Sequence, residues 1–544
     1  MAYFFQRRVM PAANTKMTPV TDFSLREGFA LKSDIEHYSR SSSDFEFIFL
    51  NVIKVFADGD IDWTGKGISK LWRYNLHYFD YIHESHRSRE AKAHLIDHWI
   101  AHNPQGQEDA WEPYTLSLRL VNWIRFFSQP EIRSLVTDKW LASLHHQACW
   151  LEQNLEFHIL GNHLLKNAKA LFFAGMYFDG GDADRWLIKS IKLLEDQANE
   201  QILPDGGHFE RSPMYHSIVC HDFLDILSLA LGMRERMGAA YSIDVEFYQR
   251  KCRALLDFLF DVCMPDGDIP LFNDSAFGVA PLPETLFRYG KQLFGYRKKD
   301  PAHVMRAIEK KHSGYYLVKG KGDMLIVDAG EIGPKYQPGH AHCDTLSYEL
   351  CFGNQRIVVD SGVKDYELSA TRCYARSTEA HNTIRIDERE QSEIWGAFRV
   401  GRRARPSLVS MTLNDGVVID ASHDGYEHLK KGSVSHQRRF VYRRDTLFIY
   451  DSLHGEGTHL IESYVHLHPD LRASIDGSII EIKRDNETVA MMKVLTDIDI
   501  KIIKGQYFPE FGKEMANDVI QMSCVCNVPF DISYSIRKTT KTAE

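Results

Sequence analysis

Histidine, aspartate and tyrosine residues that could carry chemistry gather in one stretch of this sequence. His340 and His342 lie two residues apart, and Asp360, Tyr374 and His381 follow them. Positions i and i+2 of a β-strand face the same side, so this stretch can supply a three-ligand nitrogen and oxygen metal site from two histidines and a downstream aspartate. The alternative is that each histidine caps a strand or pairs with a carboxylate, which is the commoner role of a single imidazole.

A second polar group lies in the first half of the sequence. Asn162 and His163 stand just before an apolar helical run, and Pro213 fixes the backbone before Tyr215 and His216. A phenol hydroxyl and an imidazole that emerge together from a stiff loop suit proton transfer. Taken alone, Asn162 has the equal alternative of a helix N-cap.

Aromatic residues with polar neighbours form two further segments. Trp72, Tyr74 and His77 belong to one segment, and Trp111 and Tyr114 belong to the other. Such rings can form flat platforms for sugar rings, although core packing is at least as frequent for any one aromatic residue. We predict that these five residues contact a sugar substrate.

The overall charge excludes a general surface for polyanions. The 544 residues contain 65 Lys and Arg against 74 Asp and Glu, a net charge of −9. No positive field therefore surrounds the chain to hold nucleic acid or an anionic membrane, and a polyanion must be bound in a local basic cleft. Two groups of arginines can bind a carboxylate or sulfate bidentately, the alternative being that they lie on exposed strand faces. These arginines are Arg399, Arg402, Arg403 and Arg405, and Arg438, Arg439, Arg443 and Arg444.

The hydrophobic period changes once along the sequence. In the first part, apolar residues such as Leu116, Leu120 and Trp123 recur with helical spacing. In the second part they alternate as in strands, for example Leu346 and Tyr348. Since the length also exceeds what one hydrophobic core normally organises, we predict a multidomain α+β protein with helical hairpins followed by a multi-sheet β-sandwich. The predicted parts are an N-terminal segment, 1–23, a helical domain, 24–311, and a β-sandwich domain, 312–544.

The cysteine spacing and the N-terminal residues argue against a disulfide-stabilised fold and against an export signal. The 9 cysteines are scattered and contain no CxxC pair, which predicts buried free thiols rather than a disulfide framework or a zinc ribbon. Arg7 and Arg8 directly follow Phe4 and Phe5, so no apolar run for export is visible. No stretch reaches the ~18 apolar residues of a transmembrane span, and nucleotide-binding and serine-hydrolase motifs are absent.

The combined motifs resemble the heparinase II/III-type polysaccharide lyases, a family that is similar to some alginate lyases. The resemblance covers nearly the whole chain and is carried by segments 72–78, 162–163, 339–342 and 381–383. It implies an incomplete (α/α) toroid followed by an antiparallel β-sandwich domain, with the active cleft between them.

The reaction that the resemblance implies is β-elimination at a uronic acid. The C5 carboxylate is neutralised, the C5 proton is removed and the departing O4 is protonated, with the enolate-like intermediate as the hardest species to stabilise. By motif match, Asn162 and His163 are implied as the neutralising pair. Tyr215 is implied as the proton donor and, for syn elimination from glucuronate, also as the base. His340 matches the base for the opposite epimer, and Tyr374 matches a second tyrosine of the alginate-active relatives.

The resemblance also implies a metal and a substrate class. The metal is a divalent ion, usually a structural zinc, with His342, Asp360 and His381 as ligands. The implied partner is an acidic polysaccharide: a glycosaminoglycan such as heparan sulfate, hyaluronan or chondroitin, or an alginate-like bacterial exopolysaccharide. Neither nucleic acid nor a membrane is expected as a partner, and the oligomeric state is left open.

Family members are often periplasmic or secreted, whereas no signal peptide is visible here, so the compartment is left open as well. Further residues expected at the substrate are His208, Glu210, Arg211 and Arg376.

Two other functions fit parts of the sequence. A glycoside hydrolase on a helical toroid would need paired carboxylates, for which Glu210, Asp266, Asp268 and Asp274 are available. A non-catalytic polysaccharide-binding protein would keep the aromatic residues and arginines but would need neither Tyr215 nor the metal ligands. The product separates these functions, because elimination leaves a 4,5-unsaturated uronate that absorbs ultraviolet light and hydrolysis leaves a saturated end.

Overall fold

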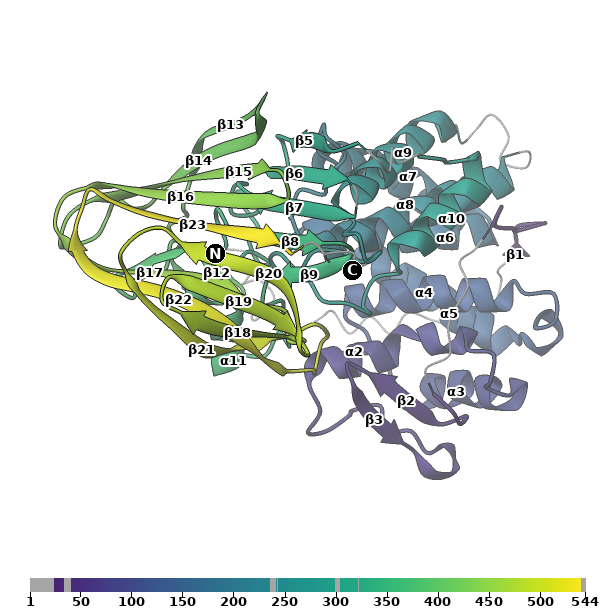
Figure 1. Cartoon of the computed structure of the whole chain (residues 1–544). Helices are drawn as coiled ribbons and strands as arrows, with labels where there is room; N and C mark the ends of the chain where they lie inside the picture. Colours follow the sequence, from purple (N-terminus) through teal and green to yellow (C-terminus); the bar gives the residue numbers. More distant parts are fainter. Residues whose placement is uncertain are drawn as a thin grey trace. The chain divides into compact units, whose positions relative to one another are not determined.

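The computed structural model describes residues 24–33, 41–234, 241, 243–298, 304–320 and 322–539 (Figure 1). The predicted N-terminal segment, 1–23, lies outside these residues. The chain forms two compact units, each of which combines three stretches of sequence. The first unit contains Met1–Gln201, Val219–Arg253 and Arg288–Tyr296, and the second contains Ile202–Ile218, Ala254–Phe287 and Arg297–Glu544. The domain boundary at residue 312 stays a prediction.

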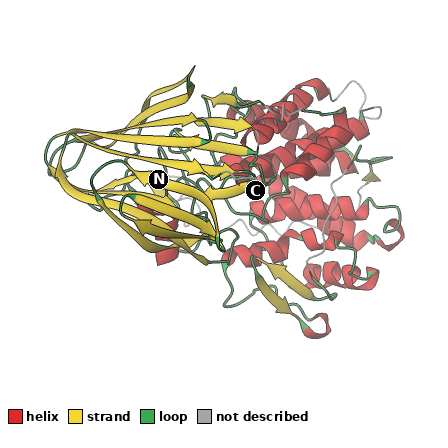
Figure 2. Cartoon of the chain, viewed as in Figure 1, coloured by secondary structure: helices red, strands yellow, loops and turns green. Residues whose placement is uncertain are grey.

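Helices build the first unit (Figure 2). Three of them begin at a serine or threonine, Ser69, Ser88 and Thr137, whose side chain accepts a hydrogen bond from the backbone N–H three residues on, as N-caps do. The predicted apolar face of Leu116, Leu120 and Trp123 is fully buried. The described α-helices are α2 (Lys70–Tyr78), α3 (Arg89–His102), α4 (Pro113–Phe127), α5 (Asp138–Gln153), α6 (Gly161–Tyr177), α7 (Gly181–Gln201), α8 (Pro213–Met233), α9 (Val245–Val262), α10 (Pro283–Phe294) and α11 (Ala370–Arg376). Of these, α8, α9 and α10 belong partly to each unit, and α11 belongs to the second.

Helix α8 is long and apolar enough, by length and composition, to cross a membrane. Within it, 78% of the 18-residue window that passes this test is buried inside the protein. The apolar residues of α8 are therefore accounted for by core packing.

Short two-stranded sheets accompany the helices. They are β1 (Ser24–Leu25) with β4 (Phe178–Asp179), and β2 (Glu46–Phe49) with β3 (Val52–Val55).

Antiparallel sheets build the second unit. The five-stranded sheet has the order β5 (Arg306–Lys310), β6 (Tyr315–Gly320), β7 (Asp323–Asp328), β8 (Tyr348–Phe352), β9 (Gln355–Val358). The eight-stranded sheet has the order β13 (Pro406–Asn414), β14 (Gly416–Tyr426), β15 (Val434–Arg443), β16 (Thr446–Gly455), β23 (Phe530–Lys538), β20 (Glu487–Val494), β19 (Ile479–Arg484), β18 (Leu471–Asp476). The four-stranded sheet has the order β10 (Ile384–Ile386), β17 (Thr458–His466), β22 (Met515–Asn527), β21 (Asp499–Tyr507), and β11 (Ile394–Trp395) pairs with β12 (Arg399–Val400).

One hydrophobic core joins these three large sheets. Leu325 of β7, Phe440 of β15 and Ile520 of β22 belong to a single cluster of buried residues. Stacked antiparallel sheets around a shared core are the sandwich that period-two patterning predicts. Helices that precede antiparallel sheets agree with the predicted α+β class.

Candidate active site

Tyr215 is held in place by the first turn of α8. Ser212 precedes the helix, and its hydroxyl accepts a hydrogen bond from the Tyr215 backbone N–H at 3.2 Å. Pro213 occupies the first helical position, where its missing N–H costs nothing and its fixed φ favours the helix. The Ser212 hydroxyl also donates to the backbone oxygen of Asp274 at 2.7 Å. This cap therefore connects the position of Tyr215 to the segment around Asp274.

The imidazole of His340 stacks on the Tyr215 ring. The two ring centroids are 3.9 Å apart and the planes are inclined by 29°. The Tyr215 hydroxyl lies 3.1 Å from the hydroxyl of Tyr366. A phenol that can release a proton and an imidazole that can accept one are thus adjacent in the second unit.

Asp274 connects the histidines to a buried arginine. Its Oδ2 lies 2.9 Å from His340 Nδ1 and its Oδ1 lies 2.8 Å from His342 Nε2. Arg372 donates to both carboxylate oxygens, at 2.9 Å for the bond to Oδ2. Burial raises the pKa of Asp274, but Arg372 and the two imidazole hydrogen bonds outweigh burial and hold this pKa well below its usual value. Asp274 is therefore an ionised carboxylate.

An ionised carboxylate fixes the tautomers of both histidines. It can only accept hydrogen bonds, so His340 Nδ1 and His342 Nε2 must each carry a proton. In a neutral His340 ring, the other nitrogen, Nε2, then has a free lone pair. Glu210 Oε2 lies 3.6 Å from this Nε2, where a carboxylate favours the imidazolium formed after proton uptake.

Within the described part of the chain, His342 and His381 each have one buried ring nitrogen without a hydrogen-bond partner. His381 Nδ1 pairs with Asp360 Oδ2 at 2.7 Å, and the rings of His342 and His381 are 5.4 Å apart. The remaining nitrogens, His342 Nδ1 and His381 Nε2, are buried and have no hydrogen-bond partner among the described residues. Burial lowers the pKa of His342 to about 4, so its ring is neutral. Burial also lowers the pKa of His381, but Asp360 outweighs burial and raises it above its usual value, so metal binding at His381 must displace a proton. Buried imidazole lone pairs with a carboxylate behind each ring are the donor set found around protein-bound zinc.

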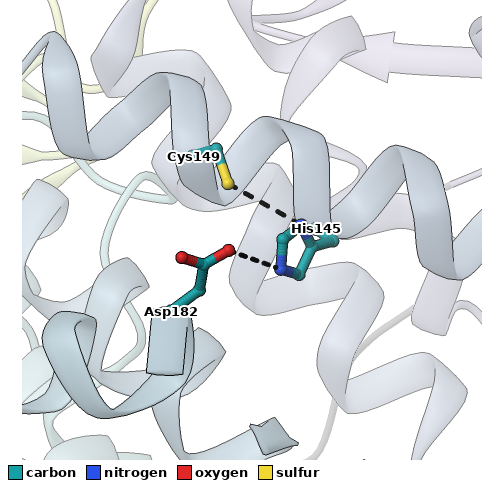
Figure 3. Close-up of side chains that lie close together, drawn as sticks. All are labelled: His145, Cys149 and Asp182. Atoms are coloured by element: carbon teal, nitrogen blue, oxygen red, sulfur yellow. Dashed lines mark hydrogen bonds and ion pairs between the residues drawn. The ribbon is translucent and has the colours of Figure 1, made fainter. Parts of the chain in front are cut away.

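A different group of residues has its possible metal-ligand atoms closer together. Within the part of the chain that the structure describes, His145, Cys149 and Asp182 are the group whose ligand atoms all lie within 4.8 Å of one another. Cys149 Sγ lies 3.7 Å from His145 Nδ1, and Asp182 Oδ2 lies 3.3 Å from His145 Nε2. Figure 3 shows the side chains of Cys149 and Asp182 pointing toward the His145 ring. Burial raises the pKa of the Cys149 thiol to about 12, so metal binding must displace its proton. These three residues could hold a metal ion, whereas the sequence predicts only a buried free thiol at Cys149.

Asn162 lies in the first turn of α6 in the first unit. The N-cap of α6 is Leu160, at φ +64° with no side-chain cap, and Gly161 at φ +58° follows. Asn162 is therefore not the N-cap, which removes the alternative role considered for it. His163 Nδ1 lies 3.0 Å from Glu156 Oε1, and the His163 ring is 4.3 Å from the ring of Tyr114.

Three of the predicted sugar-stacking residues lie in the core of the first unit. Trp72 and His77 are fully buried and Trp111 is nearly so. Their nitrogens are occupied: Trp72 donates to Val52 O at 3.1 Å, and Trp99 donates to His77 Nδ1 at 3.0 Å. Tyr74 and Tyr114 are half-buried. A sugar-binding role for these five residues stays a prediction, and the half-buried tyrosines are its most accessible members.

The remaining predicted substrate residues belong to the second unit and are mostly buried. His208 and Glu210 are buried, and Arg211 donates to the backbone oxygen of His312 at 3.2 Å. Arg376 is buried and donates to Ala341 O at 3.2 Å, which supports the loop between β7 and β8 that carries His340 and His342. This geometry makes Arg376 a positioning residue.

Two family models divide the chain between them. Residues 2–298 match the heparinase II/III N-terminal family, and residues 306–540 match the heparinase II/III-like C-terminal family. The chain belongs to the heparinase II/III family. The family resemblance seen in the motifs is thereby confirmed.

The curated relatives of this heparinase II/III family chain include heparin-sulfate lyases and a protein named for its cellular location. A heparin-sulfate lyase of Pedobacter heparinus is 24% identical over 435 residues, which cover 74% of this chain and 61% of the relative. A heparin-sulfate lyase of Bacteroides thetaiotaomicron is 22% identical over 498 residues, covering 80% and 66%. The FtsZ-localized protein C of Caulobacter vibrioides is 25% identical over 513 residues, covering 87% and 82%. The chain thus spans about 61% to 66% of the length of these two lyases.

Solved structures support the fold of the heparinase II/III chain. A heparinase III structure superposes with a TM-score of 0.71 at 17% identity and covers 90% of this chain and 81% of that one. A mutant heparan sulfate lyase from Pedobacter heparinus superposes with a TM-score of 0.62 at 20% identity, covering 91% and 81%. The predicted class, a helical toroid followed by an antiparallel β-sandwich, is confirmed by this likeness.

Sequence reasoning missed two residues of the heparinase II/III site, Tyr366 and Arg372. Asp274 was considered only as a hydrolase carboxylate, although it stands in the polar triplet 273–275 inside an otherwise apolar run. That interruption was the available signal, because polar residues inside a buried segment need partners. Nothing in the sequence indicates that Arg372, which lies 98 positions away, is that partner.

Proposed function

We propose that this chain is a polysaccharide lyase that cleaves a uronic-acid-containing acidic polysaccharide by β-elimination. Membership of the heparinase II/III family and the names of its lyase relatives support the reaction class. The observation that carries the proposal is the contact between Tyr215 and His340, with His340 held in one tautomer by Asp274. An oriented acid beside an oriented base is what elimination requires.

The proposed proton transfers use atoms whose hydrogen bonding is defined. His340 Nε2 removes the C5 proton, and Asp274 and Glu210 stabilise the resulting imidazolium, since their carboxylates lie 2.9 and 3.6 Å from the ring nitrogens. The Tyr215 hydroxyl protonates the departing O4. For a glucuronate cleaved by syn elimination, Tyr215 would perform both transfers, and Asn162 with His163 would neutralise the C5 carboxylate.

Two of the four carboxylates considered for a hydrolase, Asp274 and Asp266, are engaged in ion pairs with arginines. Asp274 is held by Arg372 and two imidazoles, and Asp266 Oδ2 is bound by Arg356 at 2.6 Å. Arg356 counts among the causes that keep the pKa of Asp266 below its usual value against the effect of burial. A hydrolytic general acid needs a raised pKa, so Asp266 and Asp274 are unsuited to that role. Burial raises the pKa of Asp268, which leaves Asp268 as the carboxylate that a hydrolase would use as its acid.

A non-catalytic role is the second candidate, favoured by one relative. The FtsZ-localized protein C matches more of this chain than either lyase relative, at 87%. Its name states where that protein is found and gives no reaction. The stacked Tyr215 and His340 with their buried charge partners favour catalysis, because a binding protein has no need of an oriented imidazole lone pair.

A product assay separates the candidates. Purified protein is incubated with heparan sulfate, hyaluronan, chondroitin, alginate and bacterial exopolysaccharides while ultraviolet absorbance and reducing ends are followed together. The lyase proposal expects reducing ends and absorbance to rise in equal amounts on at least one polymer. New reducing ends without absorbance would show hydrolysis, and neither signal on any polymer would support the non-catalytic role.

We also propose that His342 and His381, with Asp360, hold a structural zinc ion. Support comes from the buried nitrogens of the two histidines, which have no hydrogen-bond partner among the described residues, and from Asp274 behind the His342 ring. Asp360 Oδ2 pairs with His381 Nδ1, so Asp360 would bind the ion through Oδ1. Zinc would brace the wall that carries His340. The chain's own residues perform the proton transfers, and the ion takes no part in them.

Metal analysis tests the zinc site against the second cluster. We expect about one equivalent of zinc in protein purified without chelator, and its loss together with a melting temperature lower by several degrees in His342→Ala, because bound metal adds its binding energy to folding. The matched variant, Cys149→Ser, should keep the zinc. Zinc lost from Cys149→Ser and kept in His342→Ala would assign the ion to His145, Cys149 and Asp182 instead.

A further inference from the structure

Exposed aromatic rings mark a small hairpin in the second unit. Strands β11 and β12 form this hairpin, on which Trp395 is 54% exposed and Phe398 is 43% exposed. Large apolar rings in contact with water are unfavourable, and neighbouring exposed rings commonly mark a binding surface. Their flat faces match the apolar faces of sugar rings.

Two buried arginines hold this hairpin in place. Arg372 donates twice to the backbone oxygen of Ala397, at 2.9 and 3.1 Å. Arg376 donates to the backbone oxygens of Gly396 and Arg399, at 3.0 and 3.2 Å. Because both guanidinium groups are 1% exposed, the aromatic hairpin is anchored from below. A surface fixed before binding loses little entropy when a ligand arrives.

The hairpin continues directly from the candidate active site. The Phe398 ring lies 5.4 Å from the ring of Tyr366 and 6.4 Å from the ring of His340. Arg372, which holds the hairpin, is also the arginine that neutralises Asp274. A polymer bound at Tyr215 and His340 can therefore extend onto the hairpin.

An open groove with a volume of about 910 Å³ lies beside the hairpin. It is lined by segments 331–335 and 401–406, together with Asp424, Glu427 and His428. We call it the arginine groove, after Arg402, Arg403 and Arg405 in its wall. Its volume suits a ligand of one or a few sugar rings, since small-molecule sites commonly occupy ~300–1,000 Å³.

The arginines of this groove are not neutralised by carboxylates. Arg402 donates to the backbone oxygens of Gln391 and Gly425, and Arg403 donates to those of Pro334 and Lys335. Among the described residues, neither these two nor Arg405 forms an ion pair within 4.0 Å. On a chain with net charge −9, three guanidinium groups outside ion pairs offer donors to an anion, with Glu331 as the carboxylate that acts on Arg403.

Acidic residues limit where an anion can bind in the groove. Glu331, Asp424 and Glu427 lie in the same wall and repel anions from their surroundings. An anionic group is therefore favoured only next to the guanidinium groups, which bind carboxylate or sulfate bidentately. The charge pattern describes one discrete subsite rather than a broad basic surface.

We propose that the β11–β12 hairpin and the arginine groove form an additional subsite, in which a uronate or sulfated sugar some units away from the cleaved bond stacks on Trp395 and places its anionic group at Arg405. This proposal rests on the proposed function for its substrate class. The subsite would make binding of long chains tighter than binding of short ones, without changing the chemical step.

The experiment measures how affinity depends on chain length. Trp395→Ala, Arg405→Ala and their double variant are compared with Tyr450→Ala and Arg484→Ala, which remove an exposed aromatic residue from β16 and an exposed arginine from the end of β19. Binding of heparan sulfate and alginate tetrasaccharides and decasaccharides is measured by calorimetry in a Tyr215→Phe background, where no turnover interferes. KM and kcat are measured in the wild-type background.

We expect Kd and KM for the decasaccharide to rise about 5–20-fold in the double variant, with kcat within twofold and a much smaller rise for the tetrasaccharide. The salt dependence of decasaccharide binding should also weaken in Arg405→Ala. Decasaccharide affinity within twofold of the parent, or equal losses for both lengths, would overturn the subsite. Failure of the lyase proposal is a separate result, because it appears as absent product in the wild-type protein while the calorimetry still reports on the groove.

Discussion

We expect the Tyr215→Phe variant to lose about 10²–10⁴-fold in kcat while KM and the melting temperature stay close to those of the parent. The change removes one hydroxyl from a ring that stays stacked on His340 at 3.9 Å. Its hydroxyl contacts Tyr366 OH at 3.1 Å, and a hydrogen bond between two hydroxyls contributes modestly to the stability of the fold. The large effect would come from loss of the group that protonates the departing O4.

Two other tyrosines provide the controls for this prediction. Tyr366→Phe removes the hydroxyl that contacts Tyr215 and should cost only about 3–10-fold in kcat, because orientation is weakened and the acid is kept. Tyr374→Phe tests the second tyrosine suggested by the motifs, whose pKa burial raises to about 12 and whose oxygen lies 3.5 Å from Gln506 N. If Tyr374→Phe is the variant that loses activity and Tyr215→Phe stays near normal, the general acid is Tyr374.

Local patterns in the sequence predicted elements that flank the site, but they were wrong about the backbone at the site itself. Tyr215 lies in the first turn of α8 and not in a loop, and His340 and His342 lie in the loop between β7 and β8 and not on a strand. The turn residues Gly353 and Asn354 were expected between strands, and they join β8 to β9 with φ values of +56° and +64°. This pair suits glycine and asparagine because both residues tolerate left-handed backbone conformations. Helical spacing similarly predicted α4, whose apolar face fills the core of the first unit.

Burial of whole strands was harder to predict from alternation. The pattern of Leu346, Tyr348 and Leu350 suggested a strand with one exposed face, but all five residues of β8 are buried. Glu349 lies within it and is fully buried, with Arg356 Nη1 3.2 Å from its carboxylate. A charged residue in a strand normally indicates an exposed position. Here Arg356 in the neighbouring strand and the Leu271 N–H, which donates to Glu349 Oε1 at 2.6 Å, compensate for the burial of the carboxyl group.

In the candidate site, single residues could be predicted from local motifs, but the contacts between them could not. Tyr215 and His340 were found because each stands in a recognisable local motif. Their juxtaposition joins residues 125 positions apart in the chain. The role of Asp274 between His340, His342 and Arg372 depends on residues 66 to 98 positions apart. No period or turn signal encodes such pairings, which follow from how the sheets and loops pack.

The second large effect is expected for Asp274→Asn, in both stability and activity. The amide has nearly the same shape as the carboxylate but carries no charge, so the buried guanidinium of Arg372 loses its counter-charge. Breaking one side of a buried ion pair typically costs about 3–5 kcal/mol. The amide can also donate a hydrogen bond, which allows His340 to adopt the other tautomer and removes its Nε2 lone pair. We therefore expect kcat of the folded variant to fall by ~10²–10⁴-fold.

A matched variant separates positioning from general destabilisation. Asp225 is a fully buried aspartate of the first unit that pairs with Lys169 and lies 3.4 Å from His221. Asp225→Asn should destabilise the protein by a similar amount while the folded fraction keeps its kcat. Equal activity per folded molecule in both variants would show that Asp274 only supports the fold.

A double variant completes the argument about Asp274. Arg372→Gln added to Asp274→Asn removes the guanidinium that has lost its partner, so part of the lost free energy of unfolding should return. Turnover should not return with it, because neither amide fixes the tautomer of His340. Recovery of stability without activity would establish that the ionised Asp274 carboxylate orients the base, whereas recovery of both would mean that the single variant was inactive only because its site was distorted by the uncompensated charge. Urea unfolding and single-turnover rates, measured on the same preparations, distinguish these results.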